Sequence, residues 1–183
     1  MSDTIFCPFC EKETAFVIQR ETESYPVKGE ATEIEAQVTY CKECGNDIWN
    51  EKLDAQNLEL AFEIYRKKHH LLMPAEIKAI RTKYALSQSV FGRALGFGEK
   101  TITRYESGSI QDRAQNALMA LAADARTMLQ LAELNRDLLS PQEFRSIESV
   151  CRQSEKQLVP PLVMPGALTP LQYPFAADRT ACR

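Results

Sequence analysis

The sequence predicts an α+β chain in which a small N-terminal β domain precedes a longer series of helices. Residues 14–20 and 33–40 are rich in β-branched and aromatic residues, a composition typical of strands. From residue 51 to about residue 156, apolar side chains recur at helical spacing between capping residues, prolines and glycines. The length of 183 residues, with 44% hydrophobic and 26% charged, indicates ordinary globular material in one or two domains.

We expect residues 1–50 to form the β domain. One face of its second strand carries alternating residues, in the period of a half-buried strand: Ile34, Ala36, Val38 and Tyr40. Pro26 and Gly29 lie between the two strand segments and favour a turn there.

Residues 51–72 are predicted to form a linker helix. Asn50 suits the N-cap, and Glu51 complements the positive end of the helix dipole. The helix carries apolar residues at helical spacing: Leu53, Leu58, Ala61, Phe62 and Tyr65. Five basic or titratable residues follow Tyr65, near the C-terminal end where cations are favoured.

Residues 73–123 are expected to form an all-α domain of short helices. The helix boundaries follow from Pro74, Ser87, Gly96, Gly98 and Gly108. One face of the first helix is predicted to be apolar: Ile77, Ile80, Tyr84 and Ala85. Residues 124–156 continue as C-terminal helices. Residues 157–183 contain five prolines and form an extended arm or a loose tail, because this composition cannot continue as a helix.

Composition and charge restrict the location and the partners. No apolar run reaches 18 residues, and the N-terminus lacks the basic and apolar regions of a signal peptide, so we expect a cytoplasmic, reducing environment. The net charge of −3 is unevenly distributed: residues 1–70 carry −6, residues 71–122 carry +3, and residues 123–183 are balanced. Such asymmetry suggests different partners for the two ends.

Two CxxC pairs predict a metal site: Cys7 and Cys10, then Cys41 and Cys44. Four thiolates on two such turns suit tetrahedral Zn²⁺, and a site without an open position is structural rather than catalytic. The alternatives are free thiols, an iron–sulfur cluster or a redox pair, although a redox CxxC opens a helix in a βαβ unit that is absent here. We predict one structural zinc ion per chain. The remaining cysteines are expected to be free thiols: Cys151 and Cys182.

The segment "LSQSVFGRALGFGEKTITRYESG", residues 86–108, has the order of a helix, a glycine-containing turn and a second helix. In a helix-turn-helix the second helix enters the major groove. With Ile102 and Tyr105 facing the core, four residues remain for the groove: Lys100, Thr101, Thr103 and Arg104. An Arg side chain pairs with guanine, and a Thr methyl group contacts thymine.

The first helix of the pair is expected to bind the DNA backbone. Ser87 and Gln88 open this helix, where amide groups meet a phosphate. Arg93 and Lys83 are further candidates for phosphate contacts. The alternative is a five-helix bundle whose polar surface helix has no DNA-binding role.

The helix-turn-helix motif resembles the Xre/Cro type. Together with the "CPFC…CKEC" ribbon, residues 5–122 resemble the MqsA antitoxin family, which joins a YgiT-type zinc finger to an Xre domain. The resemblance implies a type II antitoxin whose zinc domain blocks a toxin, commonly a ribonuclease, and whose Xre dimer binds a palindromic operator and represses its own operon. It also implies zinc binding by the four CxxC cysteines.

The chain differs from this family in one DNA-contacting residue and in its length. Arg104 matches a base-contacting Arg of the family, whereas Lys100 stands where the family has Asn. Since Lys prefers guanine and Asn prefers adenine, the operator sequence is expected to differ. The chain also continues some 50 residues beyond the usual family end.

The acidic first segment would complement a basic ribonuclease. Alternatively, Glu30, Glu33 and Glu35 only solvate the outer face of a strand. A stand-alone transcriptional regulator with a structural zinc ribbon is the competing function. An enzyme is not expected, since no catalytic set is present and adjacent His69 and His70 point about 100° apart on a helix.

A symmetric dimer is expected to form through the C-terminal half, because one recognition helix reads few bases. The apolar residues available for a dimer interface are Leu118, Leu121, Met128, Leu129, Leu131, Leu134, Leu138, Leu139, Phe144 and Ile147. The alternative is that they only enlarge one monomer's core. The tail carries further apolar residues for this interface or for a toxin: Leu162, Val163, Leu168, Tyr173 and Phe175.

Overall fold

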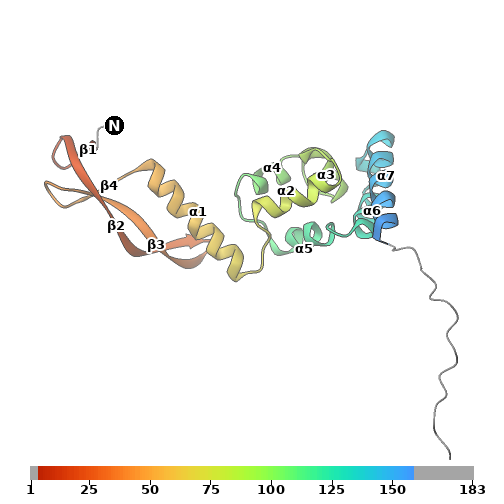
Figure 1. Cartoon of the computed structure of the whole chain (residues 1–183), viewed down its shortest axis with the longest axis horizontal. Coiled ribbons are helices and arrows are strands. Elements are labelled where there is room, and N and C mark those ends of the chain that lie inside the picture. Colours follow the sequence, from red (N-terminus) through yellow and green to blue (C-terminus); the bar gives the residue numbers. More distant parts are fainter. Residues whose placement is uncertain (1–3, 159–183) are drawn as a thin grey trace, which may run out of the picture.

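The computed structural model describes residues 4–158, which form an elongated molecule with strands at one end and helices at the other (Figure 1). The strands are β1 (Thr4–Cys7), β2 (Lys12–Val27), β3 (Glu30–Cys41) and β4 (Asp47–Ile48). The helices are α1 (Glu51–Lys68), α2 (Pro74–Lys83), α3 (Gln88–Ala94), α4 (Thr101–Glu106), α5 (Arg113–Leu121), α6 (Ala125–Leu134), the 3₁₀ turn η1 (Arg136–Leu138) and α7 (Pro141–Leu158). The predicted α+β class is confirmed. From residue 159 onward the predicted tail, with its apolar residues and Cys182, lies outside the described residues.

A single antiparallel sheet contains the four strands in the order β1-β2-β3-β4. β2 and β3 form a long hairpin in which β2 is paired from Phe16 to Val27. Lys28 and Gly29 make its two-residue turn with φ values of 52° and 82°, the left-handed geometry that suits the twist of a hairpin. The turn is therefore tighter than the sequence suggests, and Pro26 lies inside β2.

The two edges of the hairpin differ. β1 pairs with β2 only at residues 12–15, so β2 has no partner strand on its outer edge beyond residue 15 within the described part of the chain. Pro26 is tolerated on such an edge because proline has no backbone N–H, and no neighbouring strand requires one there. The edge of β3 pairs with β4 at Thr39 and Tyr40. Next to this pairing, buried Asn57 of α1 accepts a hydrogen bond from Gln37 N and donates one to Gln37 O, each at 3.0 Å.

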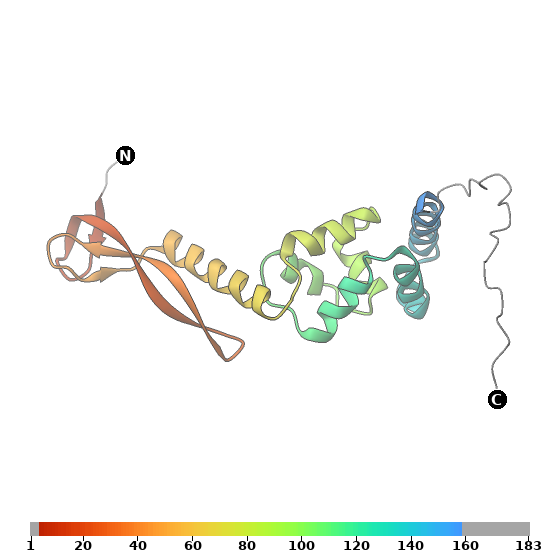
Figure 2. The same ribbon diagram turned by 60° about the horizontal axis from the view of Figure 1, so that its bottom comes forward.

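Helix α1 runs along the hairpin and ends at the helical domain (Figures 1 and 2). As the sequence indicates, Asn50 caps it by accepting a hydrogen bond from Leu53 N at 3.3 Å. Ala61 of α1 packs with three buried residues of the hairpin: Val27, Ile34 and Ala36. Leu58, which the sequence pattern placed on the apolar face, is instead 43% exposed.

One continuous core joins helices α2 to α7. Its completely buried members are Ile77, Tyr84, Phe91, Ala94, Ile102, Met119, Ala122, Met128, Ala132, Ile147 and Cys151. The Tyr84 hydroxyl donates to Ala122 O at 2.7 Å, which connects the end of α2 to the end of α5. Ala85, expected on the apolar face, is exposed and has a φ of 54° because α2 has already ended. Among residues 4–158, no helix is both long and apolar enough to span a bilayer.

Candidate metal centre and nucleic-acid interface

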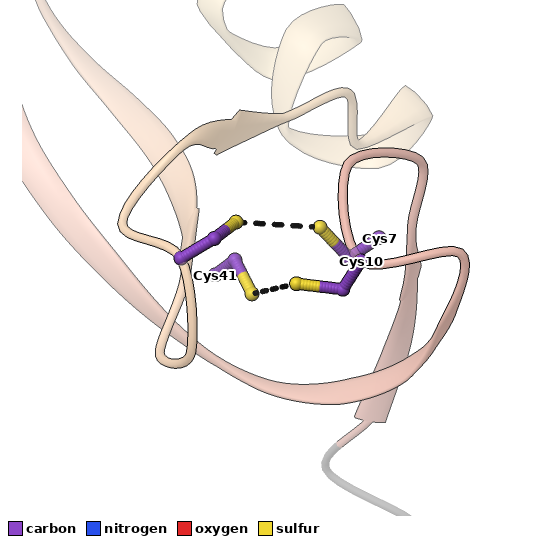
Figure 3. A group of neighbouring side chains, drawn as sticks. Cys7, Cys10 and Cys41 are labelled. Carbon is purple, nitrogen blue, oxygen red and sulfur yellow. Dashed lines mark hydrogen bonds between the residues drawn. The ribbon is translucent and has the colours of Figure 1, made fainter.

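Two turns of the sheet bring four cysteines together. Cys7 ends β1 and Cys10 lies in the turn to β2, whereas Cys41 ends β3 and Cys44 lies in the turn to β4. Their sulfur atoms all lie within 4.8 Å of one another. The Sγ atoms of Cys7 and Cys44 are 3.6 Å apart, and those of Cys10 and Cys41 are 4.0 Å apart. Figure 3 shows the labelled side chains of Cys7, Cys10 and Cys41 converging.

This spacing fits a tetrahedral metal ion. Zinc–sulfur bonds of about 2.3 Å separate the sulfur atoms of a tetrahedron by about 3.8 Å, which lies between the two closest separations found here. Cys7 and Cys41 are buried, whereas Cys44 is exposed, so the site is at the surface but partly shielded. Four thiolates complete a tetrahedron and leave no position for a substrate, which favours a structural role.

Hydrogen bonds give Cys41 and Cys10 of the cluster different pKa values. Thr14 Oγ1 lies 3.4 Å from Cys41 Sγ, and the Glu43 N–H donates to the same sulfur at 3.4 Å. These contacts favour the thiolate and lower the pKa of Cys41 to about 6. Hydrogen bonding with Cys44, followed by burial, raises the pKa of Cys10 to about 12. Metal ions therefore compete with protons at this cluster, as at other thiolate sites.

Three large aromatic side chains near the metal site are exposed, and the sequence reasoning assigned them no role. They are Phe6 (54% exposed), Phe9 (61%) and Trp49 (72%). Phe6 and Phe9 each precede a cysteine of the first pair, and Trp49 follows β4. Large exposed aromatic residues are enriched where proteins bind partners.

Helices α3 and α4 lie within residues 86–108, the segment for which the sequence predicts a helix-turn-helix. In α4, Ile102 and Tyr105 are buried in the core. Three of the four predicted groove residues are exposed: Lys100, Thr103 and Arg104. The fourth, Thr101, is only 6% exposed, so its side chain is not available to a DNA groove and we omit it from the interface.

A hydrogen-bond network connects this surface to α2. Arg81 binds Glu106 through two bonds, from Nε at 2.6 Å and from the guanidinium NH2 group at 2.9 Å. Glu106 also accepts a bond from Gln88 Nε2 at 2.7 Å, and Gln88 Oε1 accepts one from the Thr103 hydroxyl at 2.9 Å. The network fixes Gln88 at the start of α3 and Thr103 on α4 in one arrangement.

Sequence reasoning missed the two charged members of this network. Glu106 lies inside the segment of residues 86–108, but nothing in the sequence revealed that Arg81, 25 positions away, is its partner. Their side chains are only 12% and 7% exposed. Burial raises the pKa of Glu106, but the hydrogen bonds from Arg81 and Gln88 outweigh it and hold the pKa below its usual value.

The remaining predicted phosphate-binding residues have different surroundings. Ser87 Oγ accepts a bond from Val90 N at 3.2 Å, so Ser87 caps α3 as the sequence predicts. Arg93 donates to Glu143 of α7 at 2.6 Å. Lys83 Nζ donates to the carbonyl oxygen of Ala123 at 2.6 Å. Arg93 and Lys83 thus attach helices α2 and α3 to the helices and loops that follow them.

A family model described as "Antitoxin component of bacterial toxin-antitoxin system, MqsA" matches residues 5–137. The match includes the four cysteines and helices α1, α3 and α4, and it ends within η1, so α7 lies beyond it. None of the curated proteins searched matches the chain.

Proposed function

Because the chain belongs to the MqsA antitoxin family, we propose that it is the antitoxin of a type II toxin–antitoxin system. It binds and neutralises a cognate toxin in the cytoplasm and represses its own operon by binding DNA. The observation that carries this proposal is the family match over residues 5–137. The match includes both the four-cysteine site in the acidic N-terminal segment and helices α3 and α4 in the basic segment.

The metal ion in this proposal is zinc, one per chain. Cys7, Cys10, Cys41 and Cys44 hold it, and its role is structural because the four thiolates fill its coordination sphere. The ion joins the β1–β2 connection to the β3–β4 connection. It therefore fixes the base of the hairpin and the exposed aromatic residues around that base.

In this proposal α4 enters the major groove of operator DNA. Arg104 reads guanine, while Lys100 and Thr103 reach neighbouring bases. Ser87 and Gln88 contact a phosphate at the start of α3, where Gln88 is already oriented by Glu106. The net charge of +3 on residues 71–122 supports this contact.

The hairpin is the proposed toxin-binding surface. Beyond residue 15 the outer edge of β2 has no partner strand among residues 4–158, so another strand can pair with it there. Glu33 and Glu35 are exposed on β3, and the net charge of −6 on residues 1–70 complements a basic ribonuclease. Glu30 is less available, since Lys68 and His69 already bind it.

The proposed DNA-binding form is a two-fold dimer on a palindromic operator, whose half-sites lie about 34 Å apart. Most of the apolar residues that the sequence offered for this dimer pack inside the monomer, including Met128 and Ile147. Three leucines of the helical domain stay exposed and support a smaller contact surface: Leu121 (54%), Leu134 (79%) and Leu138 (44%).

The DNA-binding part is tested with a labelled fragment from the region upstream of the protein's own coding sequence. Arg104→Ala should weaken binding by about 1–3 kcal/mol and relax the preference at one position per half-site. The matched control is Arg145→Ala, which removes the same charge from an exposed position on α7. Wild-type affinity and specificity of Arg104→Ala would exclude α4 as the reading helix.

The antitoxin part is tested by co-expression with the product of the adjacent gene. We expect that product to arrest growth alone, to be harmless when co-expressed, and to co-purify with this chain. Replacing both Glu33 and Glu35 by Lys should slow association, because it reverses the charge that attracts a basic partner. A neighbouring product that neither arrests growth nor binds would favour a stand-alone regulator.

A further inference from the structure

A buried arginine connects the end of α1 to the end of the recognition helix. Arg66 is only 3% exposed, and its guanidinium donates to the carbonyl oxygens of Gly108 at 2.5 Å and Ser109 at 3.3 Å. Within residues 4–158 Arg66 forms no ion pair, and its Nε has no hydrogen-bond partner. Burial lowers the pKa of Arg66. Burying a cation is costly unless it is hydrogen-bonded, so the two bonds to main-chain oxygens partly offset the cost of burying Arg66.

The linker between α1 and α2 is also tied to the helical domain. Leu72 N donates to Asn116 Oδ1 at 2.8 Å. The buried side chain of Gln111 donates to Leu72 O at 2.6 Å and to Asn116 Oδ1 at 3.1 Å. The linker backbone is thus held by side chains of the segment that follows α4, and the junction has no free hinge at Leu72.

The tip of the hairpin completes the junction. Ile110 packs against the cluster formed by the hairpin and α1, which contains Val27 and Ala61. Glu30, beside the hairpin turn, accepts a bond from Lys68 Nζ and pairs with His69 Nε2 at 2.7 Å, which ties the hairpin turn to the end of α1. The hairpin tip, α1 and the segment after α4 therefore meet at one place (Figure 2).

This junction acts on a very short helix. α4 contains six residues, Thr101–Glu106, and such a helix is not stable in isolation. Ile102 and Tyr105 pack one side of α4 into the core, and the chain segments at its two ends further restrict its direction. The turn from α3 precedes its start, and the carbonyl groups of Gly108 and Ser109, which Arg66 binds, follow its end.

We propose that Arg66 is a positioning residue for DNA binding. By holding the main chain immediately after α4, it makes the zinc-bearing domain part of the frame that orients the recognition helix. Arg66 touches no DNA in this scheme and acts only through Gly108 and Ser109. The inference rests on the proposed DNA-binding role of α4.

The test compares Arg66→Met with Lys67→Met in the full chain. Both variants lose one positive charge from neighbouring positions of α1, but Lys67 is exposed and binds Glu63 at the surface. Two quantities are measured: affinity for the labelled upstream DNA fragment, and ¹H–¹⁵N residual dipolar couplings from the two domains. In the wild type and in Lys67→Met, we expect the couplings of both domains to fit a single alignment tensor.

Arg66→Met should require two alignment tensors and should bind DNA about ten-fold more weakly, a size usual for coupling between sites. Arg66→Lys, which keeps the charge but not the forked donor, should recover part of the affinity. If Arg66→Met does not fold, the same two measurements are made on Arg66→Lys instead. A single tensor with wild-type affinity, two tensors with wild-type affinity, or weak binding with a single tensor would each overturn the proposal.

Loss of DNA binding in Arg104→Ala is scored separately. If Arg104→Ala binds like the wild type, the proposed role of α4 fails whatever Arg66 does. If Arg104→Ala weakens binding but Arg66→Met changes neither the tensors nor the affinity, only the positioning role fails.

Discussion

Removal of the metal should unfold the two cysteine turns and leave the rest of the chain folded. The turns have almost no apolar core of their own: their cluster contains Ile48 at 6% exposure and the partly buried Ile5. Burying an isoleucine stabilises a fold by about 1.5–3 kcal/mol, whereas a structural zinc ion contributes about 10–16 kcal/mol. Fixing the backbone costs about 1–2 kcal/mol per residue, so the apolar contacts alone cannot hold these turns.

The assay is amide hydrogen exchange with and without a chelator, repeated on Cys41→Ser. We expect residues 4–15 and 41–49 to lose protection, and elemental analysis to fall from about one zinc per chain in the wild type. Cys151→Ala is the matched control, because it removes a buried cysteine of the helical core and should keep the metal. Full zinc content and full protection in Cys41→Ser would refute the role of the metal. Loss of protection throughout the helices would refute the independence of the helical core from the cysteine turns.

Other predictions concern the helical domain. Glu106→Gln should destabilise it by about 3 kcal/mol in chemical denaturation, since it leaves the Arg81 charge nearly buried without its partner. The pKa of Glu106 is lowered in the fold, so the contribution of its carboxylate to stability is complete above the ordinary pKa of 4.5 and is lost as the pH falls through the lower, folded pKa. Below pH 4.5 the stability of the wild type should therefore decline more steeply than that of Glu106→Gln. Equal slopes would contradict this. Gly96→Ala should cost about 2–3 kcal/mol in thermal unfolding, because φ is +73° and a new Cβ would lie 2.8 Å from Asn135 Oδ1. Gly29 has a φ of +82° and open space around it, so Gly29→Ala should cost only the backbone strain of about 1–2 kcal/mol. An equal loss of stability in both variants would show that the contact with Asn135 does not contribute.

Much of the fold is predictable from local signals in the sequence. Asn50 and Pro74 start helices where expected, because caps and prolines act within one turn. The length of the hairpin was not predictable, since polar residues 20–24 lack a strand signature and are held in β2 by pairing with β3. Similarly, Leu58 follows the helical period but is exposed, because α1 covers the hairpin with a narrower face.

In the candidate sites, too, the features set by local sequence were predictable and those set by tertiary packing were not. The four cysteines were predictable because CxxC spacing fixes the geometry of each pair locally. The partners of Arg93 and Arg66 were not, because Glu143 and Gly108 lie 50 and 42 positions away along the chain. The burial of Thr101 also depends on tertiary packing, since periodicity alone leaves the first residue of a short helix ambiguous.

The three hydrophobic clusters imply that the two proposed activities differ in their dependence on metal. The cysteine turns, the hairpin with α1, and the helical domain have separate cores. Loss of zinc should therefore disturb the base of the hairpin and its exposed aromatic residues, which belong to the proposed toxin-binding end. The Arg66 contacts with Gly108 and Ser109 lie beyond the second cluster and do not involve the turns. Since α1 keeps its packing on Val27, Ile34 and Ala36 in this scheme, the recognition helix keeps its support, and DNA binding should persist under conditions in which toxin binding is lost.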